Sequence, residues 1–148
     1  MNDHRPNFFI IGAPKCGTTS LAKCGTTSLA KWLSDHPQVY MSPVEEPHYF
    51  NRDLNHMNIP RKDEYLNLFE GANEAHQAIG EASTHYLFSE VAVPEERVHV
   101  IVFDDLEENA SREYQEALQF LDLDEHNRTD FRRIIPPRSA RLNGYDAS

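Results

Sequence analysis

A short apolar strand that runs into a glycine-containing loop constrains the fold of this chain more than any other feature. Residues 8–11 are all apolar and Gly12 closes the run, which is typical of a fully buried strand. Residues 13–20 contain Pro, Gly and Thr, and the helical stretch that follows is expected to end near Leu33, before Pro37. Backbone N–H groups in such a loop and at the start of a helix favour an anion. The unit therefore predicts a phosphate-binding loop, with a plain connecting loop as the alternative.

The loop differs from the ATPase phosphate-binding pattern at one position. Gly12 and Gly17 have the spacing of that pattern, but Thr18 stands where it requires a lysine. The basic residue is Lys15, inside the loop, which favours a metal-free phosphate site over a Mg-ATP hydrolase. A small P-loop kinase or NTPase stays an alternative, because the acidic pair 104–105 after an expected strand resembles a magnesium-binding motif.

The segment 15–22 is repeated without change at 23–30. A repeat of this length is too short for a solenoid, so it indicates a local duplication and provides two candidate loops. We expect the first copy to bind the anion, because Gly12 and Pro14 precede its Gly-Thr-Thr and a buried strand feeds it. The second copy is expected to lengthen the helix by about 12 Å or to bulge out.

Length, charge and cysteine content limit the class of protein. The 148 residues suit one domain, expected over residues 1–135 with an irregular tail at 136–148. The net charge of −10 disfavours nonspecific binding to nucleic acid or to an anionic membrane. No apolar run is long enough to cross a bilayer, the start lacks a signal-peptide pattern, and the two cysteines occupy the same position in the two copies. These features predict a cytoplasmic protein without a membrane partner, a disulfide or a bound metal.

The rest of the chain alternates between strand and helix patterns. A short strand is expected at 39–41, a helix at 63–70, a loop near 79–83, the clearest strand at 98–103, and a helix at 110–121. This alternation predicts an α/β fold with a mostly parallel sheet.

Residues 14–21 resemble the 5′-phosphosulfate loop of sulfotransferases that use 3′-phosphoadenosine 5′-phosphosulfate (PAPS). Further segments resemble successive blocks of that family, in the same order: 31–33, 36–37, 46–50, 80–83, 86–87, 103–106 and 120–121. The chain is most similar to the bacterial-like, carbohydrate or heparan-sulfate type of the family. The resemblance implies a three-layer fold like that of nucleotide kinases, and sulfuryl transfer from PAPS to a hydroxyl or amine of a small-molecule or carbohydrate acceptor.

The resemblance also implies roles for individual residues. The residues expected to bind PAPS are Pro14, Lys15, Cys16, Gly17, Thr18, Thr19 and Ser20. Lys15 is in addition expected to act in catalysis by neutralising charge on the leaving phosphate.

Four further residues are expected to line the acceptor side of the site. Glu46 corresponds to the general base that takes the acceptor's proton, and a capping carboxylate before Pro47 is the alternative. His48, Glu81 and Ser83 are expected to contact the acceptor. The alternatives are a satisfied polar side chain for His48 and a turn for the other two.

The chain departs from the family pattern in ways that bear on activity. The Arg-x-Pro-x-x-Arg segment that binds the 3′-phosphate is missing, and the chain is expected to be internally shortened after about residue 89. Losing such charge-assisted contacts predicts weaker PAPS binding. Glu45 also stands where the family commonly has a lysine. The alternative function is therefore a noncatalytic remnant that binds anions or a partner chain, and the sequence leaves the oligomeric state open.

Overall fold

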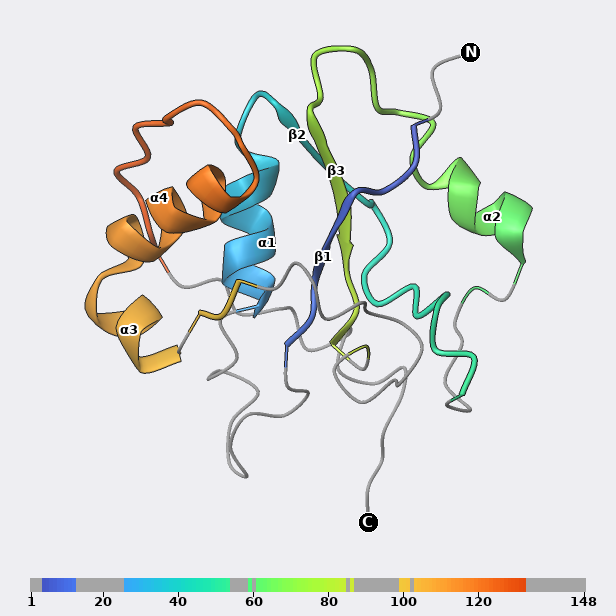
Figure 1. Ribbon diagram of the computed structural model, residues 1–148, viewed down its shortest axis with the longest axis horizontal. Coiled ribbons are helices and arrows are strands. Elements are labelled where there is room, and N and C mark those ends of the chain that lie inside the picture. Colours follow the sequence, from blue (N-terminus) through green and yellow to red (C-terminus); the bar gives the residue numbers. More distant parts are fainter. Residues whose placement is uncertain are drawn as a thin grey trace.

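The computed structural model of the chain describes residues 4–12, 26–53, 59, 61–84, 86, 99–101 and 103–132 (Figure 1). Its elements, in order, are β1 (Phe8–Ile10), α1 (Thr26–Ser34), β2 (Val39–Met41), α2 (Lys62–Asn67), β3 (Ala78–Ala82), α3 (Phe103–Glu108) and α4 (Ala110–Phe120). The expected phosphate-loop residues 14–20 and the expected tail 136–148 lie outside the described residues.

The three strands form a parallel sheet in the order β1-β3-β2. Residue Gly80 of the central strand lies opposite Phe8 of β1 and Met41 of β2. Because all three strands run the same way, their carboxyl ends meet at one edge of the sheet, where ligands of open α/β sheets bind. The expectation of a parallel α/β sheet is confirmed.

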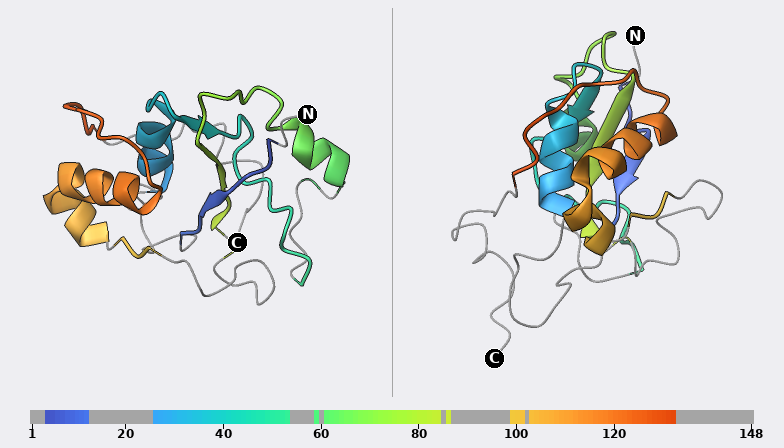
Figure 2. Two further views of the ribbon diagram at one scale, coloured as in Figure 1. Left: turned by 45° about the horizontal axis from the view of Figure 1, so that its top comes forward. Right: turned by 90° about the vertical axis from the view of Figure 1, so that its left-hand side faces the viewer.

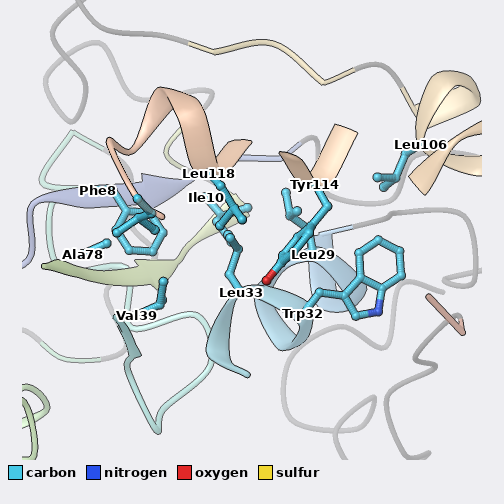
Figure 3. Packing of buried hydrophobic residues seen from close by; sticks show 11 residues of the cluster. Phe8, Ile10, Leu29, Trp32, Leu33, Val39, Ala78, Leu106, Tyr114 and Leu118 are labelled. Carbon is cyan, nitrogen blue, oxygen red and sulfur yellow. The ribbon is translucent and has the colours of Figure 1, made fainter. Parts of the chain in front are cut away.

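One face of the sheet is covered by α1 and α4. The side chains buried between them and the sheet include Phe8, Ile10, Leu29, Trp32, Leu33, Val39, Ala78, Tyr114 and Leu118 (Figure 3). The ring of Trp32 also contacts Phe131 edge-on, with 5.2 Å between centroids, which brings the segment after α4 onto this layer. Burial of this apolar stripe on both helices is what holds them to the sheet.

The opposite face is covered by α2 and the segment around Tyr49. Its buried side chains are Tyr49, Tyr65, Phe69, Ala72 and Ile79. The rings of Tyr49 and Tyr65 stack with 4.3 Å between centroids. The sheet therefore lies between two layers, with α1 and α4 on one side and α2 on the other (Figures 1 and 2). This confirms the three-layer α/β architecture.

Gly80 allows the ring of Phe8 to pack directly on the central strand. A Cβ atom at this position would lie 2.5 Å from Cζ of Phe8 and 2.7 Å from Cδ1, well inside van der Waals contact. Glycine in a strand interior commonly marks such a close approach.

The region around Glu81 was expected to be a loop, and the structure shows the central strand there instead. β3 spans Ala78–Ala82 and is buried along most of its length. This strand has small residues on one face and a buried carboxylate on the other. It therefore lacks the alternation of apolar and polar residues by which a strand is recognised in sequence.

The expected strand at 98–103 is wrong for the residues described. Residues 99–101 form no strand, Val100 is 74% exposed, and Phe103 begins α3 instead. A β-branched run forms a strand only where a neighbouring strand pairs with it, and the described residues 99–101 pair with none, although Ile101 packs against the core. Acidic residues at 104 and 105 suit the first turn of a helix.

The helix expected after the phosphate loop is confirmed, and it contains residues 26–30 of the second copy of the repeat. Ser28 and Leu29 of that copy are buried, and Leu29 belongs to the same core cluster as Phe8, Val39 and Ala78 of the sheet. Residues 26–30 thus follow the expected helix and do not bulge out. The expected helices at 63–70 and 110–121 are also confirmed, with slightly shorter bounds.

Candidate functional site

A turn crosses the carboxyl edge of the sheet beside the strand that leads into the expected phosphate loop. The N–H of Glu46 donates to the carbonyl of Ala82 (3.1 Å), and the N–H of Ser42 donates to the carbonyl of Gly80 (2.8 Å). Ser83 joins this turn to β1, because its N–H donates to the carbonyl of Ile10 (3.1 Å). The end of β1 and the turn carrying Glu46 therefore meet at one place.

The carboxylate of Glu46 is held by two neighbours and still reaches solvent. It lies 2.7 Å from Nε2 of His48, and it accepts hydrogen bonds from Oγ1 of Thr84 (2.9 Å) and from the Thr84 N–H (3.1 Å). Its side chain is 36% exposed. Burial alone raises the pKa of Glu46, but the hydrogen bonds from His48 and Thr84 outweigh it and bring the pKa below its ordinary value. The group is an oriented, ionised carboxylate at neutral pH.

His48 lies almost wholly buried behind this carboxylate. Its Nδ1 is 3.3 Å from Nδ2 of Asn51, and its side chain is 5% exposed. An imidazole that accepts from Asn51 at Nδ1 and donates from Nε2 to Glu46 satisfies both contacts.

The turn has an unusual backbone. Glu46 and His48 have φ angles of 52° and 49°, in the left-handed region that favours glycine. For side-chain-bearing residues this conformation costs on the order of 1 kcal/mol each. Such strain persists only where surrounding contacts fix it, and it concentrates at functional sites.

Glu81 is fully buried under the turn and is bound by three hydroxyl groups. They are Oη of Tyr65 (3.0 Å), Oη of Tyr86 (2.5 Å) and Oγ of Ser83 (2.5 Å). Burial raises the pKa of Glu81, and the three hydrogen bonds and the nearby His48 oppose that rise without cancelling it. Glu81 and Ser83 are both 0% exposed, so the structure places them behind the turn and not on its open side.

The structure thus brings together four of the residues that the sequence singled out, Glu46, His48, Glu81 and Ser83. Sequence reasoning missed the partners that hold them, Thr84, Asn51, Tyr65 and Tyr86. Tyr86 belongs to a segment that resembles the family, and Thr84 directly follows Ser83, so proximity in sequence was the available signal. The loop residues from Pro14 to Ser20 lie outside the described residues.

Comparison with known proteins finds similarity to sulfotransferases. No family model matches the chain. Carbohydrate sulfotransferase 15 of Rattus norvegicus and of Mus musculus are each 38% identical to it over 88 residues, and the Homo sapiens protein is 36% identical. Over these residues the chain is similar to carbohydrate sulfotransferases. The match covers 53% of this chain and 14% of each of these relatives, so the chain spans about one seventh of their length.

A solved structure shows the same fold. The crystal structure of a sulfotransferase from Alicyclobacillus acidocaldarius superposes with a TM-score of 0.72 at 21% identity, covering 90% of this chain and 87% of that chain. The two chains are therefore of comparable length, and the internal shortening expected after about residue 89 stays a prediction.

The described residues also bear on two further kinds of feature, a membrane-spanning helix and a metal site. None of the helices placed in the structure has the length and apolar character needed to cross a membrane. Within the same residues, no three His, Cys, Asp or Glu side chains are arranged to hold a metal ion.

Proposed function

We propose that this chain transfers a sulfuryl group from PAPS to a hydroxyl or amine of a small-molecule or carbohydrate acceptor. The observation that supports this function is the position of Glu46. Its half-exposed carboxylate lies at the carboxyl edge of the sheet, on a turn bound through Ala82 and Ser83 to the strand end that precedes the expected loop. Similarity to carbohydrate sulfotransferases supports sulfuryl transfer as the chemistry at that edge.

In the proposed reaction the acceptor oxygen or nitrogen attacks sulfur while Glu46 takes its proton. The new bond to sulfur forms as the bond between sulfur and the bridging phosphate oxygen breaks, and the leaving 3′-phosphoadenosine 5′-phosphate keeps that electron pair. Lys15 would neutralise the charge that develops on the leaving phosphate. The lowered pKa of Glu46 favours release of the captured proton to solvent after transfer, because the hydrogen bonds from His48 and Thr84 stabilise its ionised form.

The nucleotide side of the site is proposed to be residues Pro14 to Ser20, which include most of the first copy of the repeat and the proline before it. β1 ends at Ile10, shortly before this segment, and Gly12 lies between them. The second copy is the competing choice, because α1 as described begins at Thr26 within that copy. Both copies offer the same lysine, cysteine, glycine and threonines, so substitution of Lys15 and of Lys23 separates the two.

The proposed function is tested by incubating the purified protein with sulfur-labelled PAPS and a panel of carbohydrate, phenol and amine acceptors. We expect labelled product and an equal amount of 3′-phosphoadenosine 5′-phosphate. If calorimetry detects no binding of PAPS or of its desulfated product at millimolar concentrations in the folded protein, the proposal is wrong.

A noncatalytic, anion- or partner-binding remnant is the second candidate. It is favoured by the lack of the Arg-x-Pro-x-x-Arg segment that binds the 3′-phosphate in the family. Sulfation of any acceptor would exclude it. A magnesium-dependent ATP turnover assay tests the P-loop NTPase alternative. Turnover of ATP would support that alternative, and no turnover would exclude it.

We further propose a cytoplasmic protein with no nucleic-acid or membrane partner. The net charge of −10 supports this, since the long-range field repels polyanions and anionic lipid. Retention on a DNA column at physiological ionic strength, or sedimentation with anionic lipid vesicles, would contradict the absence of these partners.

A further inference from the structure

We propose that Glu81 is a positioning residue, which fixes the backbone of the turn carrying Glu46 and His48 through two hydroxyl relays. Its link to catalysis rests on the function proposed above, whereas its effect on the turn does not. Glu81 lies on the central strand, is 0% exposed, and cannot contact an acceptor in this arrangement. Its three bound hydroxyls lead outward to the turn.

The first relay runs through Ser83. Its hydroxyl donates to Oε2 of Glu81 (2.5 Å) and accepts the backbone N–H of His48 (3.0 Å). A hydroxyl has a single proton and two lone pairs, so donation to the carboxylate turns its lone pairs towards the His48 N–H. The backbone of Ser83 is itself bound to Ile10 of β1, which gives the relay a fixed base.

The second relay runs through Tyr86. Its hydroxyl donates to Oε1 of Glu81 (2.5 Å) and accepts the backbone N–H of Phe50 (3.3 Å). Burial and then the charge of Glu81 raise the pKa of Tyr86, so the hydroxyl keeps its proton and continues to donate. The two carboxylate oxygens of Glu81 each accept one of these hydroxyls, so one buried side chain anchors both relays.

The relays bind backbone N–H groups in the turn that contains the two positive φ angles. His48 N–H is held at a residue with a φ of 49°, and Glu46, two residues earlier, has a φ of 52°. If the two N–H groups were released, the turn could relax towards ordinary φ angles and move the Glu46 carboxylate. A displacement of about 1 Å at a reacting group can cost roughly a hundredfold in rate.

Tyr65 provides a matched control for these relays. Its hydroxyl also donates to Oε1 of Glu81 (3.0 Å), and the residue is as buried as Tyr86, at 1% exposed. In the described structure, no backbone N–H of the turn is bound to this hydroxyl. Tyr65→Phe therefore removes a buried hydrogen bond to Glu81 without interrupting a relay.

The experiment uses the full chain and the variants Ser83→Ala, Tyr86→Phe and Tyr65→Phe. NMR measures the rate of hydrogen exchange at their backbone amides. We expect exchange at His48 to speed up about tenfold or more in Ser83→Ala, and exchange at Phe50 to do so in Tyr86→Phe. In Tyr65→Phe both amides should keep their protection once the change in global stability is subtracted. Glu81→Gln, if it folds, should release both amides.

Kinetics give the second readout. With an acceptor that the wild-type protein sulfates, Ser83→Ala and Tyr86→Phe should lower kcat about 10- to 100-fold with little change in the affinity for 3′-phosphoadenosine 5′-phosphate. Tyr65→Phe should retain most of the wild-type kcat. Equal loss of kcat in all three variants would mean that the network only stabilises the core, and would overturn the proposal.

The two proposals fail separately. Unchanged exchange at His48 in Ser83→Ala and at Phe50 in Tyr86→Phe would refute the relays even in an active enzyme. If no acceptor is sulfated, the proposed function fails, and release of both amides in Glu81→Gln would still establish that Glu81 positions the turn.

Discussion

Nε2 of His48 lies 2.7 Å from Oε2 of Glu46, and the two residues flank Pro47 in a turn where both have positive φ angles. The backbone conformation is what permits this contact, because it brings side chains two residues apart onto one side of the turn. His48 is buried and Glu46 is partly exposed, so the pair presents one oriented carboxylate to solvent. This geometry suits a group that receives a proton from a bound acceptor.

Replacing Glu46 by Gln should remove the proposed general base while keeping the side-chain volume. We expect kcat for sulfation to fall about a hundredfold or more, with nearly unchanged affinity for 3′-phosphoadenosine 5′-phosphate. Steady-state kinetics and calorimetry measure the two quantities. Glu45→Gln is the control, because it neutralises the neighbouring, exposed carboxylate; an equal loss in that variant would point to net charge as the cause.

Lys15→Ala should abolish binding of 3′-phosphoadenosine 5′-phosphate, and Lys23→Ala should leave it within a fewfold of wild type. The expectation follows from the position of the first copy after β1 and Gly12. Calorimetric titration of the two variants side by side measures it, since the substitutions are chemically identical. Loss of binding in Lys23→Ala alone would transfer the site to the second copy, which contains the described start of α1.

The Glu46 interactions should make stability depend on acid pH. The pKa of this carboxyl is lowered from its ordinary value of 4.5, chiefly by His48 and Thr84 against the effect of burial. The resulting stabilisation is present above about pH 4.5 and is lost as the pH falls through the lowered folded-state pKa. Because the side chain is partly exposed, we expect no more than about 1 kcal/mol. Urea unfolding of the wild type and Glu46→Gln from pH 7 to pH 3 measures it.

Glu81 should show the opposite sign in the same experiment. Burial raises its pKa, so its contribution is greatest below the ordinary carboxyl pKa and declines as the pH rises through the folded-state pKa. Relative to Glu81→Gln, the wild type should therefore lose stability with rising pH. Parallel trends for the two variants would contradict the assignment of opposite environments to these carboxylates.

Gly80→Ala should destabilise the protein by about 1–3 kcal/mol, because the added methyl group overlaps the Phe8 ring across the β1–β3 pairing. Chemical denaturation measures the loss. Shortening the ring in the double variant Phe8→Leu/Gly80→Ala should recover part of it, so that the double variant costs less than the sum of the two single changes. Additive losses would show that the clash is relieved elsewhere.

Several elements could be predicted because their signals are local. α1 and α4 carry apolar side chains at helical spacing, and β1 is a short apolar run closed by glycine, so their burial could be inferred from periodicity. The clustering of Glu46, His48, Glu81 and Ser83 was instead predicted from the resemblance to a family, because no local pattern indicates it. Residues 99–101 show the limit of such signals, since β-branched residues there form no strand in the structure.

Sequence patterns were enough to predict a buried strand, a loop and a helix suited to an anion, the alternating elements of an α/β fold, and a resemblance to sulfotransferases. They were not enough to predict which strand lies at the centre of the sheet or which partners hold the polar residues near Glu46. Glu81 shows the reason. Its partners Tyr65, Ser83 and Tyr86 come from a helix and from the segment after β3, and their hydroxyls converge on one buried carboxylate only after α2 packs on the sheet. A local sequence pattern indicates whether a residue is buried. The partner of a buried polar group depends on contacts between segments far apart in the chain.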